Sequence, residues 1–314
     1  MVAVSTLGAL AALALTFAPF GYAEVEFMTP SWAPWPPELV PTVPLAGAAA
    51  GTLVDGYWQV QQIAPDTYAI GEPHDQLDNY EYLLIGKTRA LLIDAGATRR
   101  DIHPVLATLT NLPVTVIPTH LHSDHTNGLQ YFSSIALIDL HETRLRVEEG
   151  KAHLGRYQYM DTEHPPVFQV SEWVKPDAFV NLGERRVQVL STPGHTTTSI
   201  SVHDAAAKLL FAGDLICTCT LYAFMPDSSL SDYVATAYRL LTTLPADTVV
   251  YGAHCCRNDA PAQAPWLGMN DVRDVRQAVQ RIRNGSAMGR GLIIRRFPVN
   301  SLMTIVTFYP FANR

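Results

Sequence analysis

One short stretch restricts what this chain can fold into more than any other. Residues 119–128, THLHSDHTNG, place three of the chain's 11 histidines and one aspartate within six positions. They follow the apolar run VTVIP, which begins at Val114 and predicts a buried strand. His120 and His122 are two residues apart and can point to the same side, whereas Asp124 and His125 can face a neighbouring point. One loop could therefore serve two metal ions.

Imidazole nitrogens and carboxylate oxygens are the ligands that zinc prefers when water must occupy the remaining position. A single loop supplies too few of them for two ions, so further ligands are expected at the ends of later strands. His195 in STPGHT, Asp214 in FAGDL and His254 in VVYGAH each follow such a strand. The sequence predicts a two-metal centre from seven residues: His120, His122, Asp124, His125, His195, Asp214 and His254.

Strands and helices occur in two sets along the folded part, which is expected to span residues 57–314. The first set comprises two hairpins, a helix over 100–109 and the strand from Val114. The second comprises further strands, a helix over 232–244 with Ser231 as N-cap, a helix over 272–283 and a β-rich end. Mixed elements in both sets suggest an α+β fold with two sheets face to face and helices outside.

The N-terminus reads as an export signal. Residues 1–23 carry no charged side chain, and their apolar run is too short to span a bilayer, so we expect a signal peptide and an exported protein, periplasmic or secreted. An uncleaved segment would be the only membrane contact, and a buried or disordered N-terminus is the alternative. Residues 24–56 are rich in proline and predict an extended arm or linker.

Composition narrows the class of partner. A net charge of -7 gives no basic field for phosphate backbones, so nucleic acid is not expected. The four cysteines form two close pairs, Cys217 with Cys219 and Cys255 with Cys256, without zinc-finger spacing. In an exported protein the pairs could bridge each other, or they could be small buried hydrophobic residues.

The segments HLHSDH, TPGH, AGD and GAH, in this order and at these intervals, resemble the metallo-β-lactamase fold hydrolases over about residues 57–256. The resemblance implies a four-layer αββα sandwich and two zinc ions, with iron or manganese as alternatives. It places His120, His122 and His195 at the first metal. Asp124, His125 and His254 would bind the second, and Asp214 would bridge the two. Asp94 resembles the family aspartate that holds a ligand or a loop without binding metal.

An aspartate at position 214 is typical of the glyoxalase II and lactonase relatives, which favours a thioester or lactone as substrate. A hydroxide between the metals would attack the acyl carbonyl, and Asp124 would orient it and accept its proton. A β-lactam hydrolase is one alternative. A mononuclear iron sulfur dioxygenase, from another class, is the second.

A small-molecule acyl substrate needs an apolar pocket beside the metals. The stretch over 143–173 predicts a helix followed by an irregular loop that overhangs them. Tyr157 and Tyr159 in that stretch, and Tyr222 and Phe224 after Asp214, are the candidate substrate-binding residues, although each could instead pack the loops onto the body.

Overall fold

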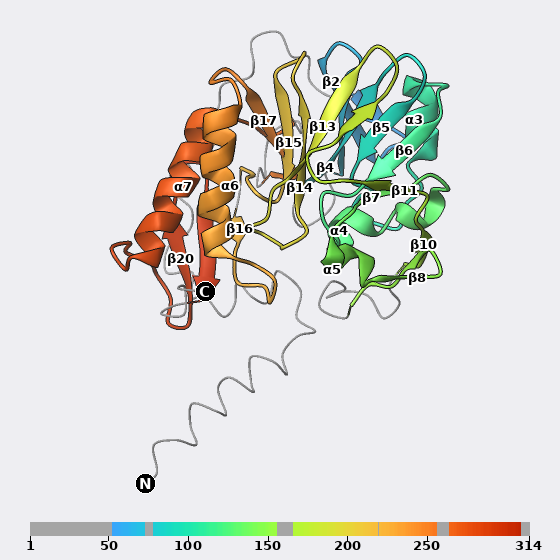
Figure 1. Ribbon diagram of the computed structural model, residues 1–314. Helices are drawn as coiled ribbons and strands as arrows, with labels where there is room; N and C mark the ends of the chain where they lie inside the picture. Colours follow the sequence, from blue (N-terminus) through green and yellow to red (C-terminus); the bar gives the residue numbers. More distant parts are fainter. Residues whose placement is uncertain (1–51, 73–77, 156–165, 219, 256–263, 309–314) are drawn as a thin grey trace.

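The structure is a computed structural model that describes residues 52–72, 78–155, 166–218, 220–255 and 264–308 (Figure 1). The expected signal peptide and nearly all of the Pro-rich arm lie outside these residues. None of the helices within the described ranges has the length and apolar character needed to cross a bilayer.

The first sheet holds the histidine-rich loop, residues 119–128, at its edge. Its strands run β1-β2-β3-β4-β5-β6, antiparallel up to β5, while β5 and β6 are parallel and β18 adds to β4. The run Ala90–Ile93 is buried at every position, as its apolar sequence predicts. The strands are β1 (Thr52–Val54), β2 (Trp58–Ala64), β3 (Thr67–Glu72), β4 (Asp78–Ile85), β5 (Ala90–Ile93), β6 (Val114–Ile117) and β18 (His254–Cys255).

The second sheet runs β12-β13-β14-β15-β17-β19, and only β15 and β17 within it are parallel. Its strands are β12 (Phe179–Asn181), β13 (Arg186–Ser191), β14 (Ile200–Asp204), β15 (Leu209–Gly213), β17 (Val249–Gly252) and β19 (Trp266–Gly268). Tyr82, Leu91 and Ile93 of the first sheet share one buried cluster with Val202 and Phe211 of the second. The two sheets therefore pack face to face.

Helices cover the outer face of each sheet (Figure 1). On the first sheet, α3 (His103–Leu109) buries Val105 and Leu106. On the second, α6 (Leu230–Thr243) and α7 (Met269–Arg283) share a cluster with Leu210 and Val250. The predicted apolar face of the last helix, Val272, Val275, Val279 and Ile282, is buried there. The four-layer αββα architecture expected from the sequence is confirmed.

Smaller elements complete the fold around the sandwich. The expected β-rich end forms a three-stranded sheet of order β16-β21-β20, whose inner side packs on α6 and α7. The remaining elements are β7 (Ala136–Ile138), β8 (Val147–Glu148), β9 (Lys151–Ala152), β10 (Phe168–Gln169), β11 (Glu172–Val174), β16 (Thr220–Tyr222), β20 (Ile294–Pro298), β21 (Thr304–Phe308), α4 (Ser123–Thr126), η2 (Leu129–Tyr131) and α5 (His141–Arg144).

Three sequence expectations differ from the structure. The first sheet begins at Thr52, before the expected domain start at Tyr57, because β1 pairs with β2. The helix expected over 100–109 begins at His103, with Pro104 in its first turn, where proline's missing N–H costs nothing. The helix expected after Thr143 ends at Arg144, and short strand pairs follow it.

Ser229, and not Ser231, caps α6. The Ser229 hydroxyl accepts a hydrogen bond from the backbone N–H of Asp232 at 3.2 Å, which satisfies one of the exposed N–H groups of the first turn. Ser229→Ala is therefore expected to cost about 1 kcal/mol of unfolding free energy. Ser231→Ala, inside the same first turn, should cost less. Urea unfolding of both variants checks this, and equal losses would contradict the assignment of the cap.

Candidate metal centre

The loop predicted from THLHSDH lies where β5 and β6 end side by side. His120 follows β6, His122 occupies the N-cap position of the short helix α4, and Asp124 and His125 lie within that helix. All three histidines are buried. The ends of two parallel strands meet at one edge of the sheet, so the loop lies beside Asp94, which follows β5.

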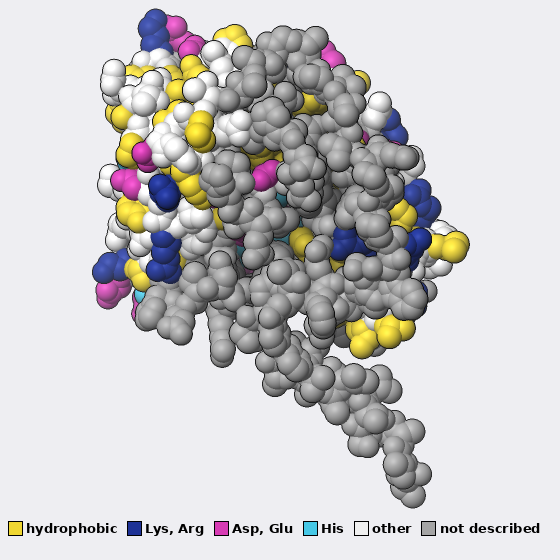
Figure 2. Space-filling model, turned by 180° about the vertical axis from the view of Figure 1, so that it is seen from behind, with side chains coloured by type: hydrophobic (Ala, Val, Ile, Leu, Met, Phe, Trp, Pro, Cys, Tyr) yellow, Lys and Arg dark blue, Asp and Glu magenta, His cyan; other side chains and the backbone are white. Residues whose placement is uncertain are grey.

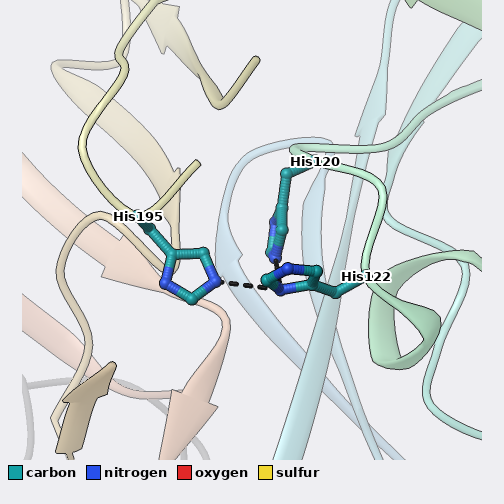
Figure 3. A group of neighbouring side chains, drawn as sticks. All are labelled: His120, His122 and His195. Atoms are coloured by element: carbon teal, nitrogen blue, oxygen red, sulfur yellow. Dashed lines mark hydrogen bonds between the residues drawn. The ribbon is translucent and has the colours of Figure 1, made fainter. Parts of the chain in front are cut away.

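His120, His122 and His195 form the first group, and their rings point toward one another (Figure 3). His195 comes from the loop between β13 and β14. Nδ1 of His122 lies 2.9 Å from Nε2 of His120 and 3.0 Å from Nε2 of His195. Three ring nitrogens from two separate sheets thus meet at one point.

The outer nitrogens of two of these rings are occupied. Nδ1 of His195 donates to the carbonyl oxygen of Tyr222 at 2.8 Å. Nδ1 of His120 lies 3.2 Å from the Thr119 hydroxyl, which gives its own proton to Asp94 at 3.0 Å and so can accept from His120. When neutral, His120 and His195 therefore each point an unprotonated Nε2 at Nδ1 of His122. That nitrogen carries one proton at most, so it can donate to only one of the two. A cation would satisfy all three nitrogens.

Asp124, His125, Asp214 and His254 form the second group. Nε2 of His254 lies 3.3 Å from an oxygen of Asp124 and 3.2 Å from Oδ1 of Asp214, and Nε2 of His125 lies 3.3 Å from the same Oδ1. The other oxygen of Asp214 lies 3.6 Å from Nε2 of His195. One carboxylate therefore stands between the two groups.

Several buried nitrogen and oxygen atoms of these residues make no hydrogen bond of good geometry to the described part of the chain, and have at most an ion-pair neighbour at 3.2–3.6 Å. They are Nε2 of His125, both ring nitrogens of His254, Oδ1 of Asp124 and Oδ1 of Asp214. Buried polar atoms are rarely left without a partner, because desolvation without a hydrogen bond is costly. Two nitrogens and two carboxylates around one point are a suitable donor set for zinc, so the residues fit a second cation.

Two rings of the first group, His120 and His122, resist protonation. Burial, together with the neighbouring histidines, holds the pKa of His120 well below its usual value. Burial, and then the adjacent His195, lowers the pKa of His122 to about 3. Neutral rings at physiological pH keep their lone pairs available to a metal ion.

The second group holds protons instead. Burial works against a charge on His254, but Asp214 and Asp124 outweigh it and raise its pKa to about 10. The pKa of His125 is raised in the same way, by Asp124 and Asp94 against its burial. These histidines in turn hold the pKa values of Asp124 and Asp214 well below the usual range, despite burial.

Asp94 lies where the sequence expects it, behind the ligand candidates. It accepts hydrogen bonds from the backbone N–H of Thr119 at 2.5 Å and from Nδ1 of His125 at 2.9 Å, and its own φ is +64°. Sequence reasoning missed Thr119, whose hydroxyl connects Asp94 to His120. Its position as a polar residue directly before the first histidine was the available signal.

Gly213, in the AGD segment, is required by close packing. A Cβ atom there would lie 2.6 Å from the Thr119 hydroxyl oxygen, and its φ of +52° disfavours other residues. Gly194, in PGHT, has a similar role, since its Cβ would lie 2.9 Å from the ring of Tyr233. Both glycines let a ligand candidate's backbone approach a neighbouring element.

The remaining candidates lie elsewhere or act differently. Tyr157 and Tyr159 fall outside the described residues. Tyr222 is buried and contacts His195 through its backbone carbonyl, while its ring packs edge-on against Phe224 at 5.9 Å. A role for either ring in binding substrate stays a prediction.

The cysteines are described in part. Cys217 and Cys255 are each buried in a hydrophobic cluster, and Cys219 and Cys256 are not described. On the face seen in Figure 2, basic and acidic side chains lie in several separate places.

Comparison with known proteins finds relatives whose sequences are similar to that of this chain. An acyl-coenzyme A thioesterase MBLAC2 from Gallus gallus is 28% identical over 181 residues, which cover 51% of this chain and 65% of the relative. A hydroxyacylglutathione hydrolase from Francisella tularensis subsp. novicida is 25% identical over 182 residues, which cover 58% of this chain and 64% of the relative. The chain thus spans just under two thirds of the length of these curated relatives.

Solved structures share the fold. A metallo-beta-lactamase from Pontibacter korlensis superposes with a TM-score of 0.54 at 20% identity, over 71% of this chain and 99% of that one. The DIM-1 metallo-beta-lactamase gives 0.54 at 13% identity, over 71% and 97%. The family model of the metallo-beta-lactamase superfamily matches residues 78–254, which is more than half of the chain and spans all seven ligand candidates. The chain therefore belongs to the metallo-beta-lactamase superfamily.

Proposed function

We propose that this protein hydrolyses thioesters and that it does so with two zinc ions, one held by each group. Two lines support the proposal. The similar proteins include an acyl-coenzyme A thioesterase and a hydroxyacylglutathione hydrolase, both named for the hydrolysis of a thioester. The donor atoms of the two groups converge, and several are buried without a hydrogen bond to the described chain.

The position of Asp214 is the single observation that carries the proposal. Its carboxylate points one oxygen toward His125 and His254 and the other toward His195. A shared carboxylate lowers the repulsion between neighbouring cations, which is what a two-metal hydrolase needs. An aspartate at this position also favours thioester or lactone substrates over β-lactams, as expected from the sequence.

The reaction adds water across the C–S bond: the water oxygen joins the acyl carbon, and the thiol sulfur leaves with a proton. Bound zinc ions supply Lewis acidity toward the acyl carbonyl and lower the pKa of water. Asp124 is suited to carry the proton from the attacking water to the departing sulfur, because it is ionised at neutral pH and its Oδ1 makes no hydrogen bond within the described chain. Asp94 holds His125 and, through Thr119, His120 in orientation.

The test combines metal analysis with a substrate panel on the full chain. We expect about two zinc ions per chain and zinc-dependent thiol release from acyl-coenzyme A or hydroxyacylglutathione, abolished by a chelator and restored by zinc. Lactones and nitrocefin complete the panel. Turnover confined to nitrocefin would indicate a β-lactam hydrolase, and one iron with oxygen consumption would indicate a dioxygenase. A zinc-loaded chain without thiol release would refute the proposal.

A further inference from the structure

A buried polar pair on β4 lies directly behind the second group. Asn79 and Glu81 are both fully buried. Asn79 stands opposite His254 in the register between β4 and β18, and the adjacent backbone N–H of Tyr80 donates to the carbonyl oxygen of Ala253 at 2.8 Å. The start of β4 therefore fixes the backbone that carries His254.

The side chain of Asn79 reaches the other part of the same group. Its amide nitrogen donates to the backbone carbonyl oxygen of Asp124 at 2.9 Å and to Oε1 of Glu81 at 3.0 Å. A primary amide has two hydrogens, so both are used. One residue thus connects the strand of His254 with the short helix of Asp124, which are 130 positions apart in sequence.

Glu81 fixes the orientation of that amide. Burial raises the pKa of its carboxyl well above the usual value, and the nearby carboxylates of Glu72 and Asp94 raise it further. An uncharged Glu81 offers Oε1 as an acceptor without placing another negative charge behind the metals. The hydrogen bond to Glu81 keeps the Asn79 amide from turning over. In the turned orientation the amide oxygen of Asn79 would face the carbonyl oxygen of Asp124, and both are acceptors.

We propose that Asn79 is a positioning residue for the second metal ion. It holds Asp124 and His254 at the separation that binding of this ion requires. The inference rests on the proposed two-metal centre. In the structure that separation is 3.3 Å between Nε2 of His254 and an Asp124 oxygen. Asn79 contacts the backbone of Asp124 and stands opposite His254, two members of the second group, so loss of its contacts should weaken the second site more than the first.

Zinc titration of an Asn79→Leu variant tests this. Leucine keeps the approximate size and adds no charge, but it removes both hydrogen bonds. With zinc alone, in competition with a chromogenic chelator, the weaker binding step is expected to weaken about 10- to 100-fold, as for other residues that orient metal ligands. The tighter step should keep its affinity. Asn79→Ala is the milder second variant, since a water molecule can replace the amide in the space it leaves.

Asn300→Leu is the matched control. The Asn300 amide also donates to two acceptors, Asp271 at 2.9 Å and Asp274 at 3.0 Å, but at the first turns of α7. We expect it to lower thermal stability and to leave both zinc steps unchanged. The inference is overturned if a folded Asn79 variant titrates like the wild type, if both steps weaken equally, or if the wild type binds only one zinc ion. No substrate is used, so absent thioesterase activity would refute the proposed function and leave this inference standing.

Discussion

Asp214→Ala is expected to reduce thioester hydrolysis by about 10³-fold, an effect comparable to the loss of one preorganised electrostatic group in other active sites. The carboxylate lies between the two groups: Oδ1 is 3.2 Å from Nε2 of His254 and 3.3 Å from Nε2 of His125, and Oδ2 is 3.6 Å from Nε2 of His195. In the proposed two-zinc centre, its removal would take away the negative charge shared by the two groups. The measurements are kcat, KM and zinc content per chain.

Two control variants, Asp214→Asn and Asp247→Ala, separate loss of the bridging carboxylate from general effects of substitution. Asp214→Asn keeps the volume and one oxygen, so it should retain more zinc than the alanine variant but remain impaired. Asp247→Ala removes an exposed aspartate whose ion pair, among the described residues, is with the exposed Lys208, so it should behave as the wild type. An alanine variant at 214 that keeps two zinc ions and the full rate would show that the carboxylate does not bridge the metals.

The parts of this molecule that sequence predicted are those that local pattern controls. The uninterrupted apolar run at Ala90–Ile93 required a strand buried on both faces, and the spacing of Val272, Val275, Val279 and Ile282 required a helix with one buried side. The seven ligand candidates were found because histidine and aspartate recur at successive strand ends, a pattern that metal binding accounts for and core packing does not. The structure brings all seven together.

What sequence did not predict depends on contacts between distant segments. Nothing local to His254 indicates that two residues there pair with the start of β4, and this pairing brings Asn79 behind the site. The Ser229 cap was misplaced by two residues, because two serines flank Leu230 and only the backbone angles of the first turn distinguish them. The supporting role of Thr119 depends on Asp94, 25 positions away, whose placement follows from the parallel pairing of β5 and β6.

Zinc affinity at the two groups is expected to depend on pH in different ways. In the metal-free protein, despite burial, Asp214 and Asp124 raise the pKa of His254 to about 10, and Asp124 and Asp94 raise that of His125, so both rings hold a proton to higher pH than an ordinary histidine does. A raised folded-state pKa stabilises the metal-free fold fully below about pH 6.5 and loses that contribution as the pH rises through about 10. Zinc must displace the same protons, so they oppose metal binding throughout that window.

The second zinc ion should therefore bind up to about 100-fold more weakly for each unit of decrease in pH between 8 and 6, because two protons are displaced. The first ion meets His120 and His122 already neutral, since their pKa values are lowered, and these two rings release no proton. Zinc titrations at several pH values, with proton release followed by an indicator dye, measure both slopes. The ionised Asp124 and Asp214 contribute nothing to either slope in this range, because their pKa values lie well below it. Equal pH slopes for the two binding steps would mean that the protons of the metal-free centre are not held by His125 and His254.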